Sequence, residues 1–107
     1  MILDTSAIVA IALNEPERDR LVDAILDATA AKISAASMVE ISAVLMRRMA
    51  LEDFRRVERL IDQLGIETVP FDAEQAARAT RAYRDFGRGS GHPAGLSLGD
   101  CYSYALA

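Results

Sequence analysis

Three short apolar segments, separated by long stretches of helical pattern, place the strongest constraint on the fold of this chain. Strands are predicted at residues 2–4, 32–34 and 66–71, and helical spacing of apolar residues fills the intervals. Strands joined through a helix cannot form tight hairpins, so they should run parallel, with right-handed crossovers. The sequence therefore predicts an α/β fold in which helices flank a small parallel sheet as a three-layer sandwich.

The helical segments are predicted from apolar residues that recur at intervals of three and four. All 107 residues should form one domain, because this length supports a single hydrophobic core. The predicted helices cover residues 5–13, a stretch from Pro16 to about Ala30, a stretch from near Ser37, residues 54–64 with Gly65 as a C-terminal cap, residues 76–86, and the stretch from Ser97 to the end.

Composition excludes several classes of protein. The longest unbroken apolar run, residues 7–13, is too short to span a bilayer, and the single Cys101 cannot form an internal disulfide. Both features predict a cytoplasmic protein without a membrane segment. The net charge of −4 gives no support to nucleic-acid binding by itself, so a polyanion would have to meet a local basic patch or a bound cation.

Three acidic residues occupy similar local settings: Asp4 in LDTSA, Glu40 in SMVEI and Asp100 in SLGDC. One interpretation is helix capping, in which Asp4 caps the helix that follows it. Ser37 and Ser97 each precede an acid by three residues, which is the spacing of a capping box. Such caps are common and contribute about 1 kcal/mol each.

The other interpretation is that the three acids converge on a cation. Two carboxylates about 4 Å apart repel by about 4 kcal/mol at an effective dielectric constant of 20. A cluster of three therefore requires a bound proton or a metal ion. Oxygen ligands without a His or Cys partner favour Mg²⁺ or Mn²⁺, and such ions serve phosphodiester hydrolysis. Sequence spacing leaves both interpretations open.

Three segments carry a resemblance to a known family: MILDTSAIVAIALNEPE, SAASMVEISAVL and FGRGSGHPAGLSLGDCYSYALA. In order and spacing, they resemble the PIN-domain ribonucleases, in particular the VapC-type toxins of bacterial toxin–antitoxin modules. The resemblance implies a Mg²⁺- or Mn²⁺-dependent endoribonuclease whose metal ligands and catalytic residues are Asp4, Glu40 and Asp100. Thr5 or Ser6 is then expected to support the metal-bound waters or the phosphate.

The resemblance also implies partners and one departure. The expected partners are RNA, a cognate VapB-type antitoxin and a second copy in a homodimer. Family members continue past the last helix into another strand and a fourth acid, whereas this sequence ends at Ala107, which predicts a truncated fold that lacks both. The alternative function is therefore a non-catalytic PIN-like module that binds an antitoxin or RNA.

The sequence also allows predictions for three further residues near the last helix. The loop GRGSG lacks the ending of a phosphate-binding loop, so it is predicted as a surface loop from which Arg88 could contact RNA. His92 is expected to be solvent-exposed. Cys101 is expected to pack rather than to act as a nucleophile.

Overall fold

Three parallel strands form the sheet of this protein, whose residues 1–107 are all described by a computed structural model. The strands are β1 (Ile2–Leu3), β2 (Lys32–Ser34) and β3 (Glu67–Val69), and they lie in the order β1-β2-β3. Leu3 pairs with Ile33, and Ile33 pairs with Thr68. The predicted parallel α/β arrangement is confirmed.

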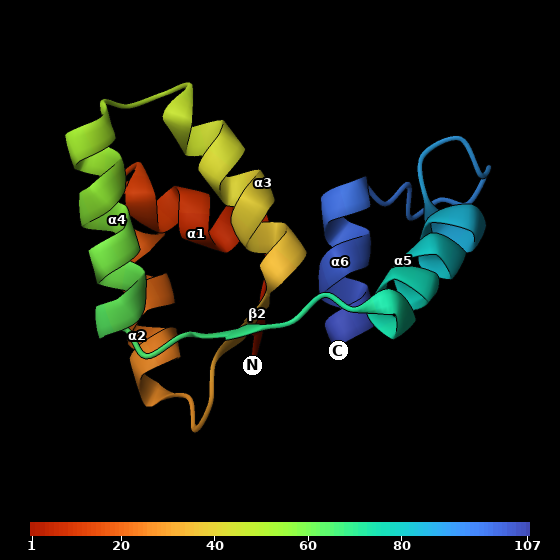
Figure 1. Ribbon diagram of the computed structural model, residues 1–107, viewed down its shortest axis with the longest axis horizontal. Coiled ribbons are helices and arrows are strands. Elements are labelled where there is room, and N and C mark those ends of the chain that lie inside the picture. Colours follow the sequence, from red (N-terminus) through yellow and green to blue (C-terminus); the bar gives the residue numbers. More distant parts are fainter.

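Six helices connect and cover the strands (Figure 1). Their bounds are α1 (Thr5–Ala12), α2 (Arg18–Asp27), α3 (Ala35–Met46), α4 (Leu51–Gln63), α5 (Ala73–Phe86) and α6 (Leu98–Leu106). Gly65 directly follows Leu64, the C-cap of α4. Its φ of 70° is a left-handed conformation that glycine adopts easily. None of these helices is both long enough and apolar enough to cross a membrane.

Several helix starts differ from the prediction. Helices α4 and α5 begin at Leu51 and Ala73, three residues before the predicted ranges. Helix α2 begins at Arg18, two residues after Pro16, which lies in the preceding turn. Helix α3 begins at Ala35 because Ser34, the last residue of β2, accepts a hydrogen bond from the Ala36 N–H. The predicted capping box of Ser37 and Glu40 is therefore wrong: Ser37 is fully buried inside the helix.

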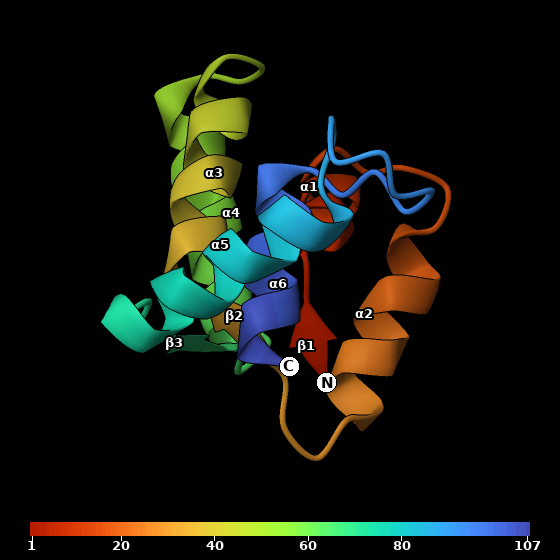
Figure 2. The same cartoon turned by 90° about the vertical axis from the view of Figure 1, so that its right-hand side faces the viewer.

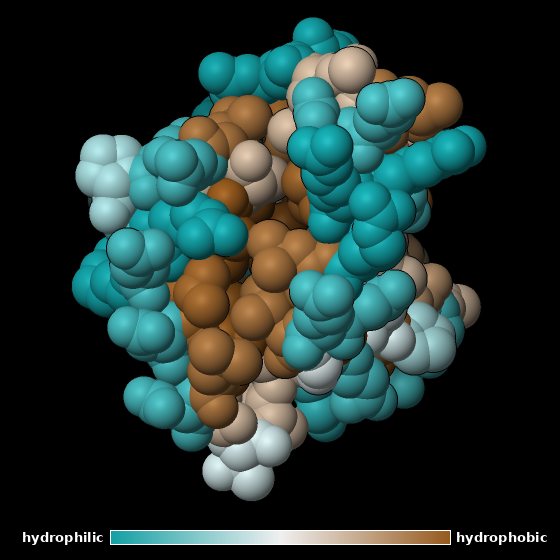
Figure 3. Space-filling model, turned by 90° about the vertical axis from the view of Figure 1, so that its left-hand side faces the viewer, coloured by the Kyte–Doolittle hydropathy of each residue, from teal (hydrophilic) through white to brown (hydrophobic).

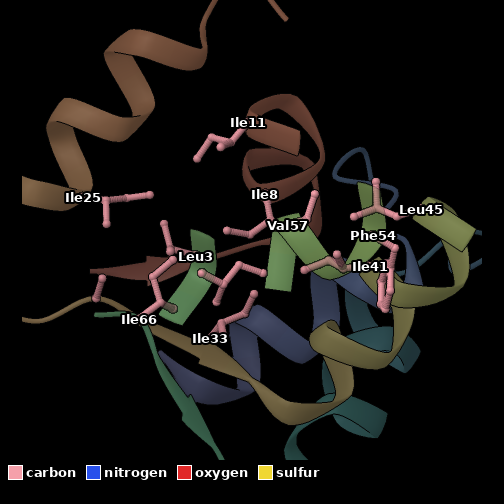
Figure 4. Close-up of a cluster of buried hydrophobic side chains, with 12 residues drawn as sticks. Leu3, Ile8, Ile11, Ile25, Ile33, Ile41, Leu45, Phe54, Val57 and Ile66 are labelled. Atoms are coloured by element: carbon pink, nitrogen blue, oxygen red, sulfur yellow. The ribbon is translucent and has the colours of Figure 1, made fainter. Parts of the chain in front are cut away.

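The core lies on both faces of the sheet. The larger cluster joins β-strand residues such as Leu3 and Ile33 to apolar residues of α1 to α4, including Ile41 and Leu45 (Figure 4). A second cluster packs α5 against α6 through small residues, and α6 contacts β1 and β2. Figure 2 shows α6 beside β1, with its first turn near α1. This packing brings the starts of α1 and α6 to the carboxyl ends of the strands.

A matched pair of leucines tests the assignment of the core. Leu45 is 0% exposed and Leu26 is 61% exposed. Leu45→Ala should lower the free energy of unfolding by about 2–5 kcal/mol, because it leaves a cavity. Leu26→Ala should change it by less than about 0.5 kcal/mol. Urea unfolding followed by circular dichroism measures both, and equal losses would contradict this packing.

Candidate functional site

A pocket of about 240 Å³ lies where β1 ends, and it collects residues from three distant parts of the sequence. Helix α1 and its cap supply one wall, α3 supplies a second, and the first turn of α6 supplies the third. The residues that line it are Asp4, Thr5, Ser6, Val9, Glu40, Ser97, Gly99 and Asp100. The structure thus places Asp4, Glu40 and Asp100 in one pocket, together with both hydroxyl residues named from the sequence.

Asp4 is the N-cap of α1. Its Oδ1 accepts hydrogen bonds from the Ala7 N–H at 3.0 Å and from the Ser6 hydroxyl at 2.8 Å. The helix begins here because extended backbone at Asp4 lets the carboxylate reach amides that have no partner within the helix. The carboxylate that interrupts the apolar start of the chain therefore ends β1 and begins α1.

Glu40 projects from the middle of α3 and is held by a residue far away in sequence. Its Oε1 accepts a hydrogen bond from the Thr5 hydroxyl at 2.5 Å. Thr5 is the first residue of α1, so this bond joins the start of α1 to the middle of α3 at one side of the pocket. Thr5 and Ser6 thus each hold a carboxylate of the pocket in position.

Asp100 belongs to a capping box at the start of α6. The Asp100 N–H donates to the Ser97 hydroxyl at 3.1 Å, and the Ser97 N–H donates to Asp100 Oδ2 at 2.9 Å. The predicted capping box is confirmed here. It fixes the first turn of α6 and with it the position of Asp100 beside the pocket.

Gly99 allows α6 to approach Glu40 closely, and the sequence interpretation did not single it out. A Cβ built at Gly99 would lie 2.6 Å from Oε2 of Glu40 and 2.8 Å from its Cδ. Any larger residue would push the carboxylate or the helix away. The sequence did contain a signal for this contact. Glycine is unfavourable within a helix, so a glycine in the first turn of the predicted last helix indicates that another group comes close there.

Capping and cation binding use different oxygens of the same side chains. The hydrogen bonds above engage one oxygen of each acid and leave Asp4 Oδ2, Glu40 Oε2 and Asp100 Oδ1 without a partner in the protein. Three free carboxylate oxygens suit a hard divalent cation. Nowhere in the chain, however, do three His, Cys, Asp or Glu side chains already stand in the geometry that holds one metal ion.

Two helix N-termini contribute to the electrostatics of the pocket. Asp4 caps α1, and Asp100 lies in the first turn of α6. The positive end of each helix dipole stabilises the adjacent carboxylate by about 0.3–1 kcal/mol. The acids are therefore stabilised where they lie, and their mutual repulsion is partly offset by the backbone.

The remaining candidate residues lie outside the pocket. Arg88 and His92 are both exposed in the loop between α5 and α6. Cys101 is fully buried, and burial raises the pKa of its thiol, as does the neighbouring charge of Asp100. A protonated, inaccessible thiol is no nucleophile, in agreement with the expectation from the sequence.

Comparison with known proteins identifies the class to which this fold and pocket belong. The PIN domain family matches residues 1–107. The sequence is 51% identical to Ribonuclease VapC42 of Mycobacterium tuberculosis, over all of this chain and 82% of that protein. It is 46% identical to Ribonuclease VapC28 of the same species, over 80% of that protein, and 40% identical to Ribonuclease VapC of Mycolicibacterium smegmatis, over 82% of it.

These matches agree with the architecture and extend over the whole chain. The protein therefore belongs to the VapC ribonuclease family of PIN-domain proteins.

Gly99→Ala tests the close approach of α6 to Glu40. Alanine favours a helix by about 1 kcal/mol over glycine, but here the methyl group meets the Glu40 carboxylate. The end of the Glu40 side chain can move aside, but it then gives up its hydrogen bond to Thr5, so we expect the free energy of unfolding to fall by about 0.5–1.5 kcal/mol. In a Glu40→Ala background the same substitution should be neutral or stabilising. Equal losses in both backgrounds, measured by urea unfolding in EDTA, would contradict the contact.

Proposed function

We propose that this chain is a metal-dependent endoribonuclease, the toxin of a type II toxin–antitoxin system, in which Asp4, Glu40 and Asp100 hold Mg²⁺ or Mn²⁺. One observation carries the proposal. Acids from three distant segments, each with a free oxygen, line a single pocket at the carboxyl edge of a parallel sheet, where such folds bind their ligands. The ribonuclease names of the relatives support RNA as the substrate.

A divalent ion, when bound, supplies Lewis-acid and water-activating chemistry that suits phosphodiester hydrolysis. The protein's own contribution is positioning. Thr5 orients Glu40, and Ser6 orients Asp4, by donating to one oxygen of each acid. The capping box holds Asp100 at the start of α6. The three side chains have to close in on a shared ion, since they do not stand in ligand geometry beforehand.

The pocket also has features that suit a phosphate. The N-termini of α1 and α6 both lie at its wall, and their free amides and dipoles favour an anion. A carboxylate pocket repels a polyanion unless a cation intervenes. Metal binding and RNA binding at this pocket should therefore depend on each other.

A cognate VapB-type antitoxin is the proposed protein partner, and the cytoplasm the proposed location. A groove of about 560 Å³ lies between α1, α2 and α4, with Ile11, Val57 and Leu60 among its apolar residues. Figure 3 shows an apolar hollow bordered by hydrophilic residues on this face. A groove of this kind accepts the apolar side of a peptide helix. Homodimer formation is a second proposed association.

The alternative is a non-catalytic module that binds antitoxin or RNA. It predicts partner binding without RNA cleavage and without a heat of Mn²⁺ binding that depends on the acids. A calorimetric Mn²⁺ titration of the wild type and of Glu40→Gln distinguishes it from the enzyme.

Substituting single acids with amides tests the catalytic assignment. Asp4→Asn keeps the cap, because asparagine caps helices as well as aspartate does, but it removes the charge. We expect RNA cleavage in Mg²⁺ to fall at least about a hundredfold for Asp4→Asn, Glu40→Gln and Asp100→Asn, with stability within about 1 kcal/mol of the wild type. The control is Asp62→Asn in α4, which should leave cleavage unchanged. Equal cleavage by the wild type and Asp4→Asn would refute the assignment.

A further inference from the structure

An aromatic side chain lies one helical turn beyond Asp100. Tyr104 follows Asp100 by four residues in α6, so the two lie on the same face of that helix. Tyr104 is 55% exposed, and its ring lies against the Phe86 ring of α5. Tyr104 lines a second pocket of about 380 Å³ together with Phe86, Arg78 and Arg81 of α5. The two pockets share no residue, but Asp100 of the acidic pocket and Tyr104 of this one lie one helical turn apart on α6.

Two more rings complete an aromatic cluster. The Phe86 ring lies 6.2 Å from the Tyr104 ring and 4.9 Å from the His92 ring, with centroids as reference points. The His92 contact is edge-to-face at 82°. Phe86 is half-buried and supports the two exposed rings on either side. The loop that carries His92 lies at the same end of the molecule as the start of α6 (Figure 1).

Hydrogen bonds within the loop hold His92 in position. The Ser90 hydroxyl donates to the Gly87 carbonyl at 2.6 Å and accepts from the His92 N–H at 3.1 Å. The Ala94 N–H donates to His92 Nδ1 at 3.0 Å, which leaves Nε2 to carry the proton of the neutral ring. A ring fixed in this way loses little conformational entropy when a ligand stacks on it.

Arg81 lies beside the cluster, and its side chain has no partner. Arg78 pairs with Glu74 at 2.6 Å, and Arg84 pairs with Asp85 at 2.9 Å. Arg81, between them on α5, is exposed and makes neither an ion pair nor a hydrogen bond. The acidic neighbour Asp85 is already neutralised by Arg84. Arg81 is therefore available for an anion.

We propose that Arg81, Phe86, His92 and Tyr104 form a platform on which single-stranded RNA lies beside the cleavage site. The proposal rests on the function proposed above and names how the substrate strand is held. Bases stack on the exposed Tyr104 and His92 rings, and Arg81 contacts a phosphate. Exposed aromatic rings beside an unpaired cation are the general means of holding single-stranded nucleic acid without reading its sequence. Continuity with Asp100 along one face of α6 directs the strand into the acidic pocket.

Fluorescence anisotropy of a short, labelled single-stranded RNA of mixed sequence, in EDTA, tests the platform without cleavage. Tyr104→Ala should weaken binding by about fivefold or more, the loss of one stacked base. Tyr104→Phe should bind like the wild type, because the ring alone stacks. The matched control is Tyr83→Ala, an exposed tyrosine of α5 that lines a different pocket, and it should leave the affinity unchanged.

The salt dependence tests the cation separately. Arg81→Ala should lower the slope of log affinity against log salt by about 0.7, the value for one phosphate contact on a single strand. Arg59→Ala, on α4 at the far end of the molecule (Figure 1), should leave the slope unchanged. Arg81 is exposed, so this variant remains informative even if Tyr104→Ala fails to fold.

Three results would overturn the platform. Tyr104→Ala could bind the RNA with wild-type affinity, or Tyr83→Ala could lose as much RNA affinity as Tyr104→Ala. The third is that Tyr104→Ala weakens only self-association or antitoxin binding. Loss of cleavage has no part in this measurement. Failure of the acid-to-amide series therefore refutes the catalytic assignment and leaves the binding result standing, and the reverse also holds.

Discussion

The two carboxylate oxygens of Asp4 have different roles, and the rest of the structure depends on this difference. Oδ1 accepts from the Ala7 N–H and the Ser6 hydroxyl, and this ends β1 and begins α1 within one residue. Oδ2 has no partner in the protein and remains available to a ligand. A carboxylate in an apolar segment is costly unless it is hydrogen-bonded. The hydrogen bonds to Oδ1 offset this cost, and Oδ2 stays free to bind a ligand.

The other two acids of the pocket also use one carboxylate oxygen for a hydrogen bond and leave the other free. Asp100 uses Oδ2 in the capping box of α6, and Glu40 uses Oε1 to accept from Thr5. Gly99 then lets α6 come against the Glu40 carboxylate. The scaffold and the candidate metal site are thus built from the same side chains, so capping and cation binding are complementary roles of these acids. Stability and function should therefore be separable by amide substitutions, which preserve the accepting oxygen and remove the charge.

Local features of this fold could be predicted from the sequence, and long-range ones could not. The start of α1 at Asp4 and the capping box at Ser97 depend on residues within one helical turn, so both were predictable. The start of α3 was predicted at Ser37 because that serine has the right spacing to Glu40, but Ser34 caps the helix earlier. The bond from Thr5 to Glu40 spans 35 positions, and the contact of Gly99 with Glu40 spans even more. Spacing rules do not extend over such separations, and the resemblance to PIN-domain proteins is what brought these acids together in the prediction.

Paramagnetic broadening by Mn²⁺ tests most directly whether the three acids share one ion. Substoichiometric Mn²⁺ added to the isotope-labelled protein should broaden the amide signals of Thr5, Glu40 and Asp100 together, at the same metal concentration, and Glu40→Gln should weaken the effect at all three. Broadening confined to acids elsewhere, such as Glu52 and Asp53 at the start of α4, or separate responses of the three signals, would contradict a common metal site.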